Sequence, residues 1–232
     1  MRGTDLDIGK RCDFHTHTIL SDGNMIASEL ARQAEDRDYL AVAIADHADK
    51  SNIRGIIRGL VDVARDVNSL WDIRLLVGVE ITHVPHQTID ELARNSKEMG
   101  ANIVVVHGES PVEPVVKGTN AAAARSRYVD IIAHPGRLSI EDARAAADSG
   151  KFAEITAKKG HGKTNSWVAR VATETGLEML VNTDLHTPED FISQERALGI
   201  ALESGLSEKD AIRTVRDNPL RILEKTDLHF RR

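Results

Sequence analysis

Short apolar runs rich in valine and isoleucine alternate along the chain with longer stretches in which apolar residues recur at helical spacing. We count seven such runs: Cys12–Thr16, Leu40–Ala45, Ile73–Val79, Asn102–Val106, Val129–Ala133, Phe152–Ile155 and Glu178–Asn182. Most do not alternate between apolar and polar residues, which is typical of parallel strands buried on both faces. The repeated strand and helix predict an α/β fold with right-handed crossovers, either closed as a barrel or open as a doubly wound sheet.

Helix start signals mark the second half of the chain. Each places a small polar residue before a stretch of helical period, with an acidic residue or a proline in the first turn. They occur at Ser139–Asp142, Thr187–Asp190, Ser207–Asp210 and Asn218–Pro219. We therefore expect helices to begin at these positions, the last two closing the chain.

Length and charge limit the class of protein. A chain of 232 residues suits one well-buried core, so we expect a single domain over residues 1–232. Lys and Arg total 30 against 36 Asp and Glu, and a net charge of -6 argues against a protein held to nucleic acid or membrane by its overall field. No segment resembles a signal peptide or a membrane span, so we expect a cytoplasmic protein. The one cysteine, Cys12, is interpreted as an inert core residue.

Side chains that bind metals follow six of the seven apolar runs. In an extended first run, His15 and His17 point to the same side, and Asp22 lies in a Ser-Asp-Gly turn that can fold back over them. The other candidates end the second to fifth runs and follow the seventh: His47, Glu80, His107, His134, Asp184 and His186. Parallel strands share one carboxyl-terminal face, so we expect all nine side chains to meet there.

The alternative for any single member is a capped turn or a hydrogen-bonded core histidine. Nine polar groups at strand ends favour a metal centre, because buried polar groups cost free energy unless they are paired or bound to metal. Imidazoles and carboxylates without thiolates indicate zinc, manganese or iron. Nine ligands exceed the needs of one ion and predict two or three divalent ions sharing a carboxylate, an arrangement that activates water for attack at phosphorus.

A basic loop follows the sixth run, which supplies no candidate ligand. Lys158, Lys159, His161 and Lys163 precede a helix expected near Thr164, and cations at a helix amino terminus can hold a phosphate group. The alternative is a solvated basic loop. Arg137, shortly after His134, is a second candidate for phosphate binding. We place the irregular loop Pro111–Pro114 at the rim of the site.

These motifs resemble the polymerase and histidinol phosphatase (PHP) superfamily of metal-dependent phosphoesterases, especially its compact archaeal-type members that are similar to histidinol phosphatases. The resemblance runs from about Asp13 to Leu220. It rests on His15-x-His17 with Ser21-Asp22-Gly23, Asp46-His47, Gly78-x-Glu80, His107, His134-Pro135 and Asp184-x-His186.

The resemblance implies a distorted seven-stranded, TIM-like β/α barrel with three metal positions. The implied first set is His15, His17, Glu80 and Asp184; the second is Glu80, His107 and His134; the third is Asp22, His47 and His186. A hydroxide held by the metals that Glu80 and Asp184 bind would attack phosphorus. Arg137, Lys158, Lys159 and His161 would bind the substrate.

The sequence leaves three candidate functions. The first is hydrolysis of a small phosphomonoester, such as histidinol phosphate, a nucleotide or a sugar phosphate, and the acidic composition favours it. The second is a nuclease acting on RNA or DNA ends, for which the basic loop is the one indication. The third is a barrel without catalytic activity that binds RNA or protein, like the ribonuclease P subunit with a similar loop. Nine candidate ligands argue against the third, because a scaffold does not need them.

Overall fold

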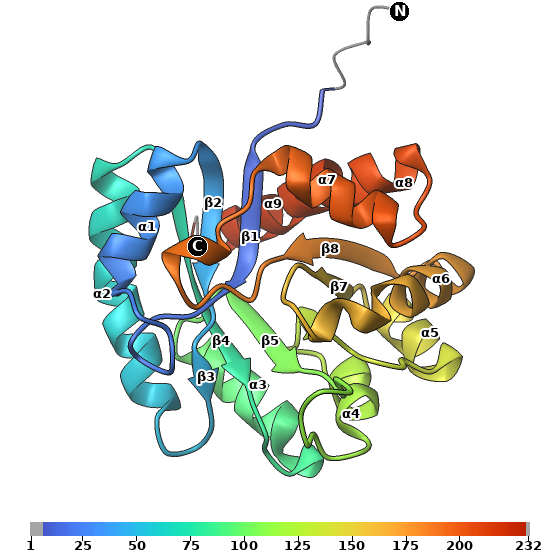
Figure 1. Ribbon diagram of the computed structural model, residues 1–232. Coiled ribbons are helices and arrows are strands. Elements are labelled where there is room, and N and C mark those ends of the chain that lie inside the picture. Colours follow the sequence, from blue (N-terminus) through green and yellow to red (C-terminus); the bar gives the residue numbers. More distant parts are fainter. Residues whose placement is uncertain (1–6, 231–232) are drawn as a thin grey trace, which may run out of the picture.

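The computed structural model describes residues 7–230, in which seven parallel strands form a nearly closed barrel (Figure 1). In ladder order the strands are β1 (Arg11–Thr16), β2 (Tyr39–Ile44), β4 (Arg74–Ile81), β5 (Ile103–His107), β6 (Ile131–Ala133), β7 (Phe152–Thr156) and β8 (Glu178–Asn182). A two-residue strand, β3 (His47–Ala48), extends the β2 side by pairing with β4. The seven predicted strands and the barrel are confirmed, and β3 was not predicted.

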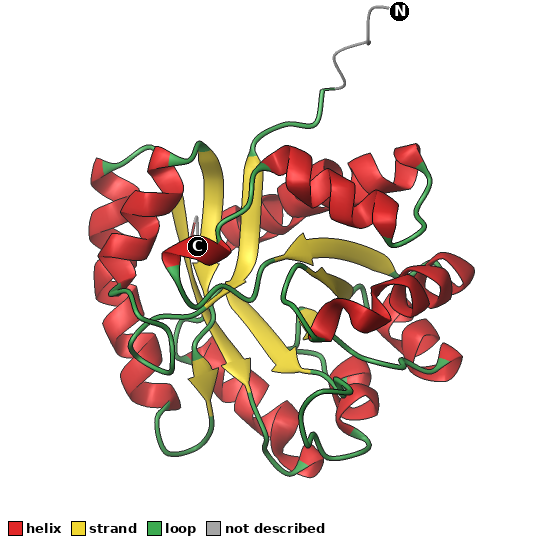
Figure 2. Cartoon of the chain, viewed as in Figure 1, coloured by secondary structure: helices red, strands yellow, loops and turns green. Residues whose placement is uncertain are grey.

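Helices surround the strands (Figure 2). They are α1 (Ala27–Asp36), α2 (Ile53–Leu70), α3 (Ile89–Glu98), α4 (Thr119–Arg125), α5 (Ile140–Asp148), α6 (Asn165–Thr175), α7 (Gln194–Glu203), α8 (Glu208–Ile212) and α9 (Asn218–Phe230). Short 3₁₀ turns lie at His86–Thr88, His161–Thr164 and Pro188–Asp190, and a π turn at Arg213–Asp217 joins α8 to α9. In the described part of the chain, no helix is both long enough and apolar enough to cross a membrane.

The predicted helix starts are confirmed at Ser139 and Ser207, whose side chains cap α5 and α8. Thr187 forms a capping box, but only a 3₁₀ turn follows, because Phe191 is extended; α7 begins behind a second cap, Ser193. The helix α9 begins at Asn218, directly after the π turn. The Asn218 amide donates a hydrogen bond to the Met179 carbonyl of β8 and so ties this helix to the barrel.

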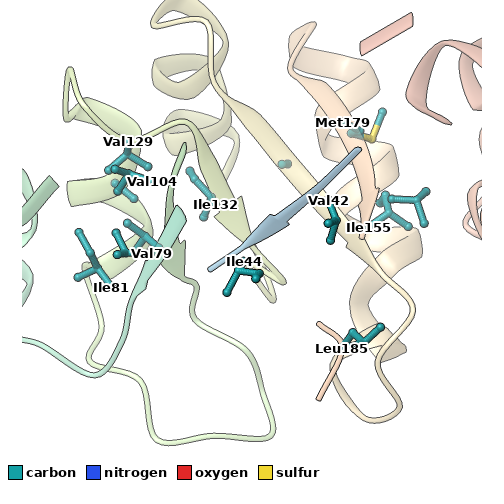
Figure 3. Close-up of a cluster of buried hydrophobic side chains, with 14 of the residues drawn as sticks. Val42, Ile44, Val79, Ile81, Val104, Val129, Ile132, Ile155, Met179 and Leu185 are labelled. Carbon is teal, nitrogen blue, oxygen red and sulfur yellow. The ribbon is translucent and has the colours of Figure 1, made fainter. Parts of the chain in front are cut away.

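Two apolar clusters follow from the period of two along the strands. The outer cluster packs strand residues against the helices and includes Val42, Val79, Val104, Ile132 and Ile155 (Figure 3). The inner cluster takes the alternate positions, with Cys12, Phe14, Ala41, Leu76, Ile103, Val105, Ile131, Phe152 and Leu180, and Ile222 of α9 joins it. Burial raises the pKa of the Cys12 thiol to about 12, as expected of a core residue. Polar residues occupy the inner positions nearer the carboxyl ends of the strands.

Candidate metal centre

Glu80 lies at the middle of a cluster of histidines at the carboxyl ends of the strands. Its side chain is fully buried on β4. Its Oε1 atom lies 3.2 Å from His15 Nε2, 3.2 Å from His107 Nδ1 and 3.6 Å from His134 Nε2. Asp184, just after β8, completes this group, with Oδ1 3.2 Å from His17 Nε2. Five strands therefore bring their predicted candidates to one point.

A second group surrounds Asp22, on the loop after β1. Asp22 Oδ2 lies 3.2 Å from His186 Nε2 and 3.6 Å from His47 Nε2. The ring of His17 lies beside both, with centroids 4.2 Å from His186 and 4.4 Å from His47. His47 also links the two groups, because its Nδ1 atom lies 2.6 Å from Glu80 Oε2. All nine predicted side chains thus meet in one contiguous cluster.

The loop that carries Asp22 is held by Asp46, the residue before His47. The fully buried Asp46 carboxylate accepts hydrogen bonds of 2.7 Å from the Thr18 amide, the Thr18 hydroxyl and the Ser21 hydroxyl. The loop also passes close to β1: a Cβ added at Gly23 would lie 2.4 Å from the His17 carbonyl oxygen. Asp46 therefore organises the loop, while the next residue, His47, faces the centre.

The donor atoms of this cluster fit divalent metal ions. His15 Nε2, both ring nitrogens of His17, His107 and His134, and Glu80 Oε1 are buried and have no hydrogen-bond partner. Buried polar atoms without partners are rare, because each one costs free energy. Among the described residues, five groupings bring ligand atoms within 4.8 Å of one another: His17, Asp22, His47 and His186; His15, His17 and Glu80; His15, His134 and Glu154; His47, Glu80 and His107; and His83, His107 and Glu113. Nitrogen and oxygen donors in this mixture suit zinc, manganese or iron.

The electrostatics favour cations at the centre. Burial raises the pKa of the Glu80 carboxyl, but the neighbouring imidazoles of His15 and His47 outweigh it and hold that pKa well below the usual range. Asp184 is also held low, by His15 and His17 against the effect of burial. For His134, burial dominates and lowers the pKa to about 4. The ionised carboxylates of Glu80 and Asp184 therefore lie in the same cluster as a neutral His134, whose ring keeps a lone pair that can bind a metal ion.

Strained backbone conformations occur in the same cluster of histidines and carboxylates. Four non-glycine residues in the described chain have positive φ: Asp38, His83, His134 and Asp184. His134 and Asp184, at φ 25° and 53°, belong to the cluster, and His83, at 52°, lies beside it. Such conformations cost about 1–3 kcal/mol each and persist only where the surroundings enforce them.

The predicted substrate residues divide between two places. His161 lies at the centre, buried, with its ring centroid 4.3 Å from that of His134 and its Nδ1 atom 2.6 Å from the Ser110 hydroxyl. Lys158 lies beside Asp184 and donates a hydrogen bond of 2.9 Å to its backbone carbonyl oxygen. Its ammonium also lies 2.8 Å from His186 Nδ1.

Lys159 and Arg137 lie farther out. Lys159 is exposed and, together with Lys163 and Arg196, lines a separate cavity of about 340 Å³. Arg137 is exposed beside Trp167, with its guanidinium carbon 5.7 Å from the ring centroid. The structure thus brings His161 and Lys158 to the predicted ligands, whereas Lys159 and Arg137 face other surroundings.

Three acidic or imidazole side chains at the centre were not among the predicted residues. Glu154 is buried on β7, with Oε2 2.7 Å from His15 Nδ1. Glu113, on the loop expected at the rim, lies 3.1 Å from His107 Nε2 and 3.2 Å from the Nε2 atoms of His83 and His161. The period of two from Phe152 would have placed Glu154 on the inner face. No local pattern fixes the path of the loop carrying Glu113, or the turn at His83.

A cavity of about 460 Å³ opens beside the cluster. Its lining includes Asp22, His47, Thr82, His83 and Glu113. Among the described residues, none that lines it is lysine or arginine. The volume is in the range of small-molecule sites.

The sequence has relatives among known proteins. The model of the PHP domain matches residues 13–126. "Uncharacterized protein MJ1295" of Methanocaldococcus jannaschii is 44% identical over 93% of this chain and 99% of its own length. "Probable phosphatase TTE1963" of Caldanaerobacter subterraneus subsp. tengcongensis is 29% identical over 92% of this chain and 91% of its own length.

The fold has solved counterparts. A chain of an archaeal ribonuclease P determined with mature tRNA superposes with a TM-score of 0.72 at 14% identity, covering 94% of this chain and 93% of that chain. Histidinol phosphate phosphatase from Lactococcus lactis, solved with zinc, L-histidinol and phosphate, gives 0.59 at 14% identity, covering 85% and 95%. At these identities the likeness is one of fold.

Proposed function

This chain belongs to the PHP domain family, and from that premise we propose that it is a metal-dependent phosphoesterase that hydrolyses a small phosphomonoester. The observation that carries the proposal is the convergence of His15, His17, Glu80, His107 and His134, whose inward nitrogens and oxygens have no partner within the protein. A barrel used only as a scaffold has no physical need for these atoms. Relatives named as probable phosphatases support the same activity.

The distances support the division of ligands that the family resemblance implies. His15, His17, Glu80 and Asp184 would hold one ion; Glu80, His107 and His134 a second; Asp22, His47 and His186 a third. We propose two or three ions of zinc, manganese or iron in these positions. Bound there, the ions would supply Lewis acidity and lower the pKa of a water molecule enough for it to act as nucleophile.

The chain itself would hold and orient the substrate. Glu80 and Asp184 lie between the histidine groups and would place the ions, and through them the phosphoryl group, at the mouth of the barrel. His161, anchored by Ser110, and Lys158 lie near enough to contribute positive charge to phosphate binding. We propose Arg137 and Lys159 as outer contacts for the substrate.

The cavity beside the cluster favours a small substrate over nucleic acid. It is lined by three carboxylates, those of Asp22, Asp49 and Glu113. A polyanionic strand would need cations along its path. The cavity with Lys159, Lys163 and Arg196, and the likeness to a ribonuclease P chain, support action on nucleic acid as the second candidate.

The test is phosphate release from histidinol phosphate, a nucleoside monophosphate, a sugar phosphate and an aryl phosphate, each with added manganese. Asp184→Ala and His15→Ala are expected to abolish release and reduce bound metal while the far-ultraviolet circular dichroism stays that of the wild type. Asp62→Asn, on the exposed face of α2, is the matched control and should keep wild-type turnover. Full turnover in either ligand variant would show that the assigned site is wrong.

A further inference from the structure

We infer that Glu154 is a positioning residue for the metal centre: it accepts the Nδ1 hydrogen of His15 and so leaves the His15 Nε2 lone pair facing Glu80 and Asp184. This inference rests on the proposed metal centre and deepens it. Glu154 is fully buried on the inner face of β7, and its Oε2 atom lies 2.7 Å from His15 Nδ1. It comes from the one predicted strand that supplied no candidate ligand.

The chemistry of imidazole explains why one contact matters. A neutral histidine carries one ring hydrogen, and the partner of one nitrogen decides which nitrogen keeps a lone pair. His15 Nε2 lies 3.2 Å from Glu80 Oε1 and 3.9 Å from Asp184 Oδ1, with no hydrogen-bond partner of its own. With the hydrogen at Nδ1, Nε2 is free to bind a metal ion. With the hydrogen at Nε2, that position would lose its ligand.

Glu154 lies at the seam where the barrel closes. The ladder order ends at β1 and β8, and an isolated bridge joins Thr16 of β1 to Leu185, on the segment that follows β8. Asn182 of β8 strengthens this seam: its Oδ1 accepts from the Phe14 amide at 3.1 Å, and its Nδ2 donates to Glu154 Oε2 at 3.1 Å. The same network therefore fixes the Glu154 carboxylate and the strand that carries His15.

The charge of Glu154 indicates that this side chain does more than hold β1 and β8 together. Glu154 Oε1 is buried and has no hydrogen-bond partner. Burying a carboxylate costs more than burying an amide, and a glutamine could accept the same bonds from His15 and Asn182 without that cost. A carboxylate here gains from positive charge nearby, which the proposed ions supply. Carboxylates that accept from metal-bound histidines also raise the basicity of the ligand.

The test is zinc affinity, measured by competition with a chelator, in the wild type, Glu154→Gln and Asn218→Ala. Glu154→Gln is expected to bind zinc about 10- to 100-fold more weakly, because the amide can keep the bond to His15 but not the negative charge that raises the basicity of this ligand, while reaching the same number of ions at saturation. Asn218→Ala is the matched control: it removes a buried bond to the opposite end of β8, so it should lower the melting temperature and leave zinc affinity unchanged.

Glu154→Asp gives a second variant if the glutamine protein folds poorly. It keeps the charge but withdraws the carboxylate from His15, so the same weakening is expected. The absorption spectrum of the cobalt-substituted protein should change in both Glu154 variants and stay unchanged in Asn218→Ala.

Two results would overturn the inference while the proposed function stands: zinc affinity in both Glu154 variants equal to that of the wild type, or loss of a whole metal equivalent at saturating zinc. The latter would make Glu154 a direct ligand. A wild-type protein that binds no zinc, manganese or iron would instead refute the metal centre itself, and the inference with it.

Discussion

At the residue scale, Glu80 is the side chain on which the centre converges. It contacts His15, His47 and His107, and it is buried at the end of a strand whose other inner residues are small or apolar. A lone buried glutamate would be costly, and its imidazole neighbours hold its pKa low instead. In the proposed metal centre, the position of this one carboxylate would determine how the surrounding histidines share ions.

Gly78 lets Glu80 reach that position. A Cβ at residue 78 would lie 2.7 Å from the Ile44 carbonyl oxygen and 3.3 Å from Ala45 Cβ, so β4 would have to move away from β2. Gly78→Ala is expected to lower the free energy of unfolding by about 1–3 kcal/mol and to weaken metal binding. Gly59→Ala is the comparison: this residue lies in the interior of α2 with open space at the Cβ, so the substitution should raise the free energy of unfolding by about 0.5–1 kcal/mol. Urea denaturation of the two variants checks both signs; a Gly78→Ala protein as stable as wild type would contradict the close packing.

Lys159 tests the outer part of the basic loop. Because it is exposed and touches none of the candidate ligands, Lys159→Ala is expected to raise KM for a phosphomonoester about two- to fivefold and leave kcat unchanged, since exposed charges contribute at most about 1 kcal/mol. Lys10→Ala, paired with Asp38 beside the amino-terminal ends of β1 and β2, serves as the control for lost surface charge. Steady-state kinetics decide; an unchanged KM would make this a solvated basic loop without a role in binding.

Most of the candidate residues could be predicted from the sequence. A histidine or acidic residue that directly follows a buried parallel strand lies at the carboxyl-terminal face of the barrel, where such side chains meet. Glu154 could have been found by continuing the alternation from Phe152 into its strand. Glu113 and His83 could not, because a loop path and a positive-φ turn depend on contacts with distant segments.

At the element scale, the loop between β1 and α1 is held through Asp46 at the end of β2. That carboxylate accepts three hydrogen bonds from Thr18 and Ser21, so two neighbouring strands together place Asp22. Sequence motifs identified both segments as parts of the site. The bond between them is a tertiary contact, and neither segment shows it by itself.

Asp46→Asn is expected to loosen this loop, because one amide group cannot accept all three bonds as a carboxylate does. Metal bound through Asp22 should be lost first, lowering the number of ions per chain by about one and reducing turnover. Asp210→Asn is the control: it also accepts from a nearby serine, Ser207, but lies at the start of α8 and holds no candidate ligand. Elemental analysis of both proteins checks this; equal metal content in the two would contradict the role assigned to Asp46.

Helix starts show the same limit of local information. Ser139 and Ser207 cap helices as predicted, since capping involves only the first turn. Thr187 has an equally good signal and yields a 3₁₀ turn, because the segment after it returns to the amino-terminal end of β2, where the Tyr39 hydroxyl donates to the Ile192 carbonyl, before α7 begins.

At the scale of the whole molecule, the interior of the barrel is apolar at one end and polar at the other. Inner residues such as Phe14 and Phe152, with Ile222 of α9, fill the apolar end, and the carboxyl ends of the strands carry the candidate metal ligands. The hydrophobic pattern predicted seven parallel strands but left a barrel and an open sheet as alternatives. Closure depends on contacts between β1 and β8, which are far apart in sequence, and only the family resemblance pointed to it.

A cluster of buried carboxylates and imidazoles should make the stability of the whole barrel depend on metal. Removing the ions with a chelator is expected to lower the melting temperature, because ligands that bind only the folded state stabilise it by about 2.7 kcal/mol at 100 times Kd. Differential scanning calorimetry with and without added manganese or zinc measures the shift. Equal melting temperatures would indicate that the cluster does not bind these ions in the folded protein.

The central claim is tested most directly by elemental analysis of the purified protein, with phosphate release from the four phosphomonoesters measured on the same sample. We expect two or three equivalents of zinc, manganese or iron per chain, with turnover on at least one substrate that a chelator removes and added metal restores. A metal-free protein that releases no phosphate from any of them after incubation with these metals would contradict the phosphoesterase and favour a barrel that binds RNA or protein.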